Sequence, residues 1–185
     1  MKIFTLKTFL VSLALVVLAL SVQAQKKKGE TITTEPKLVV TKLKVGEGET
    51  FEVRGKATFT LSAANSDDSL AGTVTYTLPE DARNKIAQIK GIPVAKVPQA
   101  ITQKDVVANF QKLTECPVVH LDFSAMDLVV EGANLHFNRF ALDVKESSNP
   151  ITMYICTIAR QINAGLPRRG PIRRINEVIN GEDSQ

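Results

Sequence analysis

Two runs of alternating apolar and polar residues, on either side of a turn at 131–134, indicate a long β-hairpin in the second half of the chain. Within each run the alternation shifts by one residue, at 124–125 in the first run and at 138–139 in the second. If the strands were unbroken, the apolar residues before the shift and those after it would point to opposite faces of the sheet. We therefore expect the hairpin to bend, at a bulge or at the corner of a sandwich or barrel. The predicted register pairs Val130 with Leu135, Leu128 with Phe137, Phe123 with Leu142, and Leu121 with Val144.

Earlier segments also favour β-structure. Apolar and β-branched residues predict a short strand at 38–40, which Gly46 and Gly48 break, and further strands over 51–61 and 71–78. The turn-forming residues 65–68 lie between the last two strands, so we expect these two to pair. The spacing of such segments predicts a mainly β domain of about six to eight strands, an antiparallel sandwich or a partly closed barrel. Three further segments are predicted as a short helix at 82–89, an edge strand or irregular segment at 92–97, and a strand, loop or helix at 102–113.

A pair of short amphipathic helices is predicted near the C-terminus. Asn149 followed by Pro150 is typical of a helix N-terminus, isoleucines recur at helical spacing after it, and Gly165 with Pro167 ends the helix. A second helix is expected at 171–180. Each helix has one apolar face, which must pack against the β domain.

The N-terminus has the pattern of an export signal. A basic start precedes a 12-residue apolar run, Phe9–Leu20, and Ala24 provides a small residue for cleavage, so residues 1–24 are predicted to be a signal peptide. The run is shorter than the ~20 residues that span a membrane, which disfavours a membrane anchor. Gln25 stands where a lipoprotein would have cysteine. We expect an exported product, periplasmic or extracellular, with no transmembrane span.

The mature chain is expected to form one domain. Residues 25–36 are polar and lack apolar periodicity, which predicts a flexible leader. Residues 37–165 are predicted to form the β domain with its closing helix. Residues 166–185 are predicted to form a basic C-terminal loop and a short helix.

Cys116 and Cys156 are the two cysteines, and both follow the predicted signal peptide. An oxidising compartment favours their pairing, so we expect a disulfide that ties the start of the hairpin to the first C-terminal helix. A catalytic thiol is the alternative. It requires a low pKa and an adjacent base, whereas two cysteines that flank one supersecondary unit better match a structural link.

Positive charge is concentrated near the C-terminus. The formal net charge of +4 falls to +2 without the two lysines of the signal peptide, and residues 157–185 hold five arginines against three acidic residues. Guanidinium groups pair with phosphate, so these arginines could bind an anionic envelope polymer or a lipid surface, unless they form a solvated helix face. Nucleic acid is not expected as a partner, because a basic stripe with stacking aromatics is lacking. The candidate anion-binding residues are Arg160, Arg168, Arg169, Arg173 and Arg174.

Polar residues on the outer face of the predicted hairpin form a second candidate cluster. The predicted register places His120 opposite Lys145, and Asp122 opposite Asp143. Two facing carboxylates would need a cation, a shared proton or neighbouring positive charges, unless this face is simply solvated. The same register places His136 opposite a valine and far from His120, so neither a metal nor a cofactor is expected.

The segment Cys116–Val144 resembles a family of uncharacterised exported bacterial proteins. The shared pattern is a cysteine four residues before His-Leu, then Asp-Leu, a glycine, a second histidine, and Leu-Asp before a helix that carries another cysteine. The resemblance implies export and a disulfide, and it implies no activity. The matching positions are Cys116, His120, Asp127, Gly132, His136, Asp143 and Cys156.

Three functions are consistent with this sequence. We expect a non-catalytic binding or structural protein of the bacterial envelope or extracellular space, because the sequence has no GxSxG elbow, HExxH helix, P-loop or dinucleotide-binding fingerprint. One alternative is a β protein that encloses an apolar ligand such as a lipid. The other is a hydrolase with a site around His120, Asp122 and Asp143.

Overall fold

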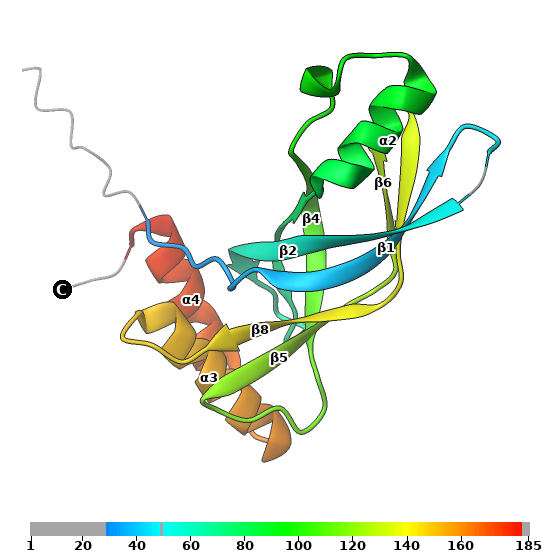
Figure 1. Cartoon of the computed structure of the whole chain (residues 1–185). Coiled ribbons are helices and arrows are strands. Elements are labelled where there is room, and N and C mark those ends of the chain that lie inside the picture. Colours follow the sequence, from blue (N-terminus) through cyan, green and yellow to red (C-terminus); the bar gives the residue numbers. More distant parts are fainter. Residues whose placement is uncertain (1–28, 49, 183–185) are drawn as a thin grey trace, which may run out of the picture.

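Eight antiparallel strands form one sheet in the computed structural model, which describes residues 29–48 and 50–182 (Figure 1). The predicted signal peptide, residues 1–24, lies outside the described residues. The strands are β1 (Lys37–Val45), β2 (Thr50–Ala64), β3 (Leu70–Thr77), β4 (Ala100–Phe110), β5 (Val118–Phe123), β6 (Met126–Val130), β7 (Ala133–Phe137) and β8 (Phe140–Lys145). The helices are α2 (Glu80–Lys90), the 3-10 helix η1 (Val94–Lys96), α3 (Pro150–Asn163) and α4 (Arg169–Asn180).

The predicted bend of the long hairpin is confirmed. Both of its strands break at the predicted positions, between β5 and β6 and between β7 and β8. Along the sheet the order is β6-β7-β1-β2-β3-β4-β5-β8, so the two halves of one hairpin form the two ends of the sheet. The sheet therefore curls into a half-barrel (Figure 1). The mainly β prediction is confirmed in its partly closed barrel form, and the sandwich alternative is wrong.

The register of the hairpin differs from the prediction by two residues. Glu131 and Gly132 both have positive φ, 48° and 69°, so the chain turns on these two residues, as in a type I′ turn. Val130 therefore pairs with Ala133 rather than with Leu135. Because side chains alternate with a period of two, every residue stays on its predicted face. The other observed pairs include Leu128 with Leu135, Met126 with Phe137, Phe123 with Phe140, and Leu121 with Leu142.

The sequence leaves the structure of residues 102–113 open. In the structure, residues 102–110 belong to strand β4, which ends at Phe110. A bulge interrupts its pairing with β3 near Asp105, which has a positive φ of 57°. β5 pairs with β4 only at Ala108–Phe110, so β3 is the one described strand that pairs with residues 100–107. A surface pocket next to this bulge is lined by β4, by the linker residues Ser124 and Ala125, and by the start of β6.

Aromatic side chains fill the inside of the half-barrel. Phe59 contacts Phe123 edge-on at a centroid distance of 5.1 Å, and Phe123 stacks on Phe140 at 4.9 Å. Tyr76 lies edge-on to Phe137 at 4.8 Å. Except for the partly buried Phe140, these rings are at most 2% exposed. The interior is therefore packed by the chain's own side chains.

Two glycines make room for these rings. A Cβ atom at Gly55 would lie 2.4 Å from the ring of Tyr76, and one at Gly72 would lie 2.6 Å from the ring of Phe59. The Tyr76 hydroxyl accepts a hydrogen bond from the Gly55 N–H at 2.7 Å and is 3.1 Å from the Thr41 hydroxyl. Burial raises the pKa of Tyr76, so the phenol stays neutral. The two contacts of its oxygen also satisfy the hydrogen bonding of a buried polar atom.

The predicted helix at 82–89 is confirmed as α2, which begins at Glu80 and ends before Gly91, a residue with φ of 65°. Residues 92–97 do not form a strand and instead contain η1. The predicted N-terminus of α3 is also confirmed, because the Asn149 side chain accepts a hydrogen bond from the N–H of the second helical residue.

The predicted disulfide between Cys116 and Cys156 is confirmed, and it links the loop before β5 to α3. α3 and α4 pack against each other, and they lie at one end of the half-barrel (Figure 1). α4 begins at Arg169, two residues before its predicted start. The Asn176 amide bonds both the N–H and the carbonyl of Ala64, at 2.8 and 2.9 Å, which fixes α4 to the end of β2.

Residues 29–36 are not a flexible leader as predicted. The Thr34 N–H donates to the carbonyl of Phe59 in β2 at 2.9 Å, which extends the β1–β2 pairing toward the N-terminus. The Glu30 N–H donates to a carbonyl in the last turn of α4 at 3.2 Å. This segment is therefore held between the sheet and the C-terminal helix, and the rest of the predicted leader lies outside the described part of the chain.

Candidate functional site

The shifted register separates the predicted polar cluster into smaller groups of polar contacts. His120 lies opposite Asp143 and not opposite Lys145, while Asp122 lies opposite an alanine. The two carboxylates therefore do not face each other, and the predicted need for a cation or a shared proton disappears. The observed pairs are His120 with Asp143 at 2.7 Å, Asp122 with Arg139 at 3.6 Å, and Lys145 with Glu35 at 2.7 Å.

Asp143 has a second partner, because the Lys37 ammonium donates to its carboxylate at 3.1 Å. Partial burial raises the pKa of Asp143, but the hydrogen bonds from His120 and Lys37 outweigh it, so the pKa lies below its usual value. The Lys37–Asp143 pair joins β1 to β8, which are not neighbours in the sheet. The cluster thus links two distant strands of the half-barrel.

Asp143→Asn is expected to lower the free energy of unfolding by about 1 kcal/mol at pH 7, because the carboxylate that bonds Lys37 and His120 is replaced by a neutral amide. A lowered pKa means that the carboxylate stabilises the folded state above about pH 4, and that this contribution is lost as the pH falls through the folded-state pKa. Urea denaturation should therefore show a difference from wild type at pH 7 that is lost near pH 2.

Asp122→Asn is the matched control, because Asp122 is as exposed as Asp143 and has one cationic partner at a longer distance. We expect it to change stability by less than about 0.5 kcal/mol. If both variants lost the same free energy of unfolding at pH 7, the contacts of Asp143 with His120 and Lys37 would not stabilise the fold more than the single contact of Asp122 does.

The two histidines each have an orienting carboxylate, but neither has a bonded nucleophile. His136 lies opposite Asp127 rather than a valine, and its Nδ1 is 2.8 Å from the carboxylate. Among the described residues no hydroxyl bonds the ring of either histidine, and the Thr114 hydroxyl accepts the backbone N–H of His120 instead. Nucleophilic catalysis needs a hydroxyl or thiol in contact with the base. Each pair is therefore a side-chain contact between two strands on the outer face of the sheet.

Cys116, Glu146 and Cys156 place their ligand atoms within 4.8 Å of one another. The two sulfur atoms are bonded to each other, so neither is a thiolate that could bind a metal. In this oxidised form the group is a structural link and not a metal centre.

Four of the five candidate anion-binding arginines already contact carboxylates of this chain. Arg168 hydrogen-bonds Asp68 through both Nε, at 3.0 Å, and Nη2, and this bonding raises the pKa of the guanidinium. Arg169 forms no ion pair with any described residue. The other pairs are Arg160 with Glu146 at 3.8 Å, Arg173 with Glu177 at 3.4 Å, and Arg174 with Glu177 at 2.9 Å.

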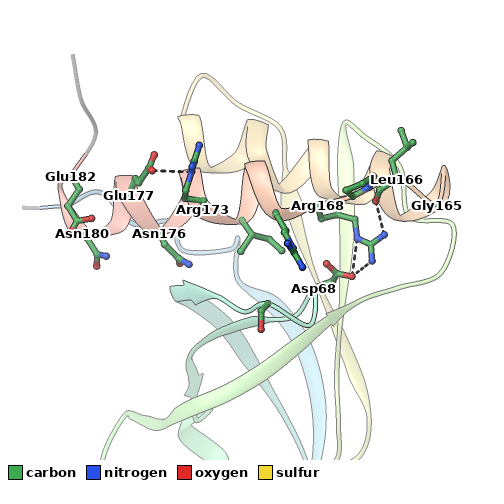
Figure 2. Close-up of a pocket in the computed structure, with 13 residues that line it drawn as sticks. Asp68, Gly165, Leu166, Arg168, Arg173, Asn176, Glu177, Asn180 and Glu182 are labelled. Atoms are coloured by element: carbon green, nitrogen blue, oxygen red, sulfur yellow. Dashed lines mark hydrogen bonds and ion pairs between the residues drawn. The ribbon is translucent and has the colours of Figure 1, made fainter.

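An open groove of about 1080 Å³ lies between α4 and the turn that joins β2 to β3 (Figure 2). The Arg168–Asp68 pair joins the start of the helix to this turn at one end of the groove. Asn176 and Asn180 lie on the side of α4 that faces Asp68 (Figure 2). Four residues that line the groove follow one another along α4 at steps of three or four, which places them on one side of the helix. They are Arg169, Ile172, Asn176 and Asn180.

The charges along α4 oppose the usual preference of a helix. α4 has no acidic residue in its first turn and no basic residue in its last, and its arginines gather in the first half. Glu177 and Glu182 lie toward the other end. An unfavourable charge near a helix end costs about 0.3–1 kcal/mol at low salt. The groove is therefore positive near Arg169 and negative near Glu182, at a cost to the stability of α4.

None of the described helices has the length and apolar character needed to cross a membrane. No protein-family model, curated protein or solved structure matches this chain. The resemblance of Cys116–Val144 to exported bacterial proteins and the export of the chain stay predictions.

Proposed function

We propose that the mature protein is an exported, non-catalytic binding protein of the bacterial envelope or extracellular space, and that the groove along α4 holds its ligand. The groove supports this proposal because it is concave and combines apolar, hydrogen-bonding and charged side chains. Export is supported by the N-terminal signal pattern and by the disulfide, a bond typical of proteins from oxidising compartments.

The rest of the structure favours a groove ligand over the two alternatives. The packed aromatic rings inside the half-barrel argue against an enclosed lipid. The His120–Asp143 pair argues against a hydrolase, since no described hydroxyl bonds its ring and the pair lies on the outer face of the sheet. Binding in the groove needs neither an internal cavity nor a nucleophile.

Ser66→Trp is expected to abolish ligand retention, because Ser66 is an exposed turn residue that lines the groove and an indole there would fill its mouth. The measurement is native mass spectrometry of the protein purified without denaturation from its own periplasm or medium. Wild-type protein should carry a bound mass, and the Ser66→Trp variant should not.

Ser148→Trp is the matched control, because Ser148 is an exposed loop residue outside the groove. It should retain the bound mass. A bound mass that persists in Ser66→Trp would place the ligand elsewhere, and a bound compound that is converted to product only when His120 is intact would contradict the non-catalytic assignment.

A further inference from the structure

Ion pairing within the groove leaves two lining charges without a partner among the described residues, and these have opposite signs. Arg168 is paired with Asp68, and Arg173 is paired with Glu177. The remaining charges are Arg169, near the start of α4, and Glu182, just beyond its end. At about 1.5 Å per helical residue, the part of α4 from Arg169 to Asn180 spans about 17 Å. Glu182 follows the left-handed Gly181, and its N–H donates to the carbonyl of Glu177 at 2.8 Å, so Glu182 lies beside the last helical turn at the end of this span.

Between these two charges the groove offers hydrogen-bonding and apolar groups. The side chains of Ser66 and Asn180 line it and form no hydrogen bond with another described residue. An amide and a hydroxyl can each donate and accept, which matches the N–H and carbonyl groups of a peptide backbone. Near the Arg169 end, Leu166 is 52% exposed and Ile172 also lines the groove, so an apolar side chain could pack there.

A uniformly anionic ligand does not match this groove. Arg168, Arg169 and Arg173 line it together with Asp68, Glu177 and Glu182, so the positive and negative lining charges balance. A polyanion or an anionic membrane that reached Arg169 would also meet the Glu182 carboxylate, and like charges repel. A ligand with a negative end and a positive end would meet a charge of the opposite sign at each end.

We propose that the groove binds a short extended segment of a partner polypeptide, about six residues long, with an acidic side chain at Arg169 and a basic side chain at Glu182. The length follows from the span of about 17 Å, which the five steps between the first and last residue of an extended hexapeptide cover at about 3.3 Å each. This inference rests on the proposed function and names the class of ligand. It also gives a reason for the unfavourable charges of α4. Arginines near the start of the helix and glutamates near its end oppose the helix dipole, but they give the groove a positive end and a negative end.

Fluorescence anisotropy with four labelled, terminally blocked hexapeptides tests this inference. Two peptides carry glutamate at one end and lysine at the other, in the two chain directions; one has glutamate at both ends and one has lysine at both ends. One of the two mixed-charge peptides should bind with a Kd at least tenfold lower than the other three. Arg169→Glu and Glu182→Arg should each raise that Kd about tenfold, and the double swap should transfer the preference to the peptide of the opposite direction.

Arg160→Glu is the control, because it makes the same charge change on the neighbouring helix α3, and neither Arg160 nor its partner Glu146 lines the groove, so the Kd should be unchanged. Tighter binding of the peptide with glutamate at both ends would overturn the inference in favour of an anion site. Failure of all four peptides to bind would also overturn it. In either case the bound mass that Ser66→Trp removes would still support the proposed function, so the two failures are distinguishable.

Discussion

Replacement of both Cys116 and Cys156 by alanine is expected to lower the free energy of unfolding by about 2–4 kcal/mol. The disulfide joins residues 40 positions apart, and the loss of conformational entropy that it imposes on the unfolded chain corresponds to about 4 kcal/mol at most. Because the bond holds α3 to the loop before β5, its loss should also loosen the packing of α3 and α4. Urea denaturation of the oxidised protein and the variant measures the difference.

Wild-type protein treated with a reducing agent is the control for this variant, since it loses the bond but keeps both sulfur atoms. Its free energy of unfolding should fall to within about 1 kcal/mol of that of the double variant, because alanine at the buried Cys156 removes little apolar volume. An oxidised protein and a double variant with the same midpoint would contradict a stabilising role for the bond.

Phe123→Ala is expected to lower the free energy of unfolding by about 3–5 kcal/mol. The Phe123 ring is fully buried and contacts Phe59 and Phe140, so its removal leaves a cavity in the middle of the half-barrel. The measurement is again urea denaturation, at neutral pH and with the disulfide intact.

Phe51→Ala is the matched control, because it removes the same side chain from β2 at a partly exposed position. It should cost about 1 kcal/mol. If Phe123→Ala cost no more than this control, the interior would have spare volume, and the alternative of a half-barrel that encloses an apolar ligand would return.

The faces of the hairpin strands could be predicted from the sequence, but their register could not. Alternation fixes which side chains point inward, and a shift of two residues leaves that pattern unchanged. The register depends on the turn, where Glu131 adopts a positive φ that is far more common for asparagine, aspartate or glycine. Gly132 was the usable signal for a two-residue turn. Because of this error, the predicted register pairs His120 with Lys145 instead of Asp143, and it pairs Asp122 with Asp143 instead of Ala141.

The groove could not be predicted because its walls come from distant parts of the chain. Asp68 and Arg168 are 100 residues apart, and each is consistent with an ordinary surface position when considered alone. Helical periodicity located α4 to within two residues, yet it could not show which turn the helix would cover. The threonine-rich segment before β1 lacks apolar residues, which favours the prediction of a flexible leader, but threonine also favours strands.

Because one hairpin forms both ends of the sheet, the sheet is incomplete until the residues up to Lys145 have been synthesised and folded. Before that point β1 and β4 are open edges, and open edges pair readily with strands of other molecules. Pairing β1 with β7 also joins segments far apart in the sequence, a step that slows folding. The newly made chain is therefore most prone to aggregate before the hairpin closes, and a chaperone that binds β1–β4 in this interval would raise the yield of folded protein.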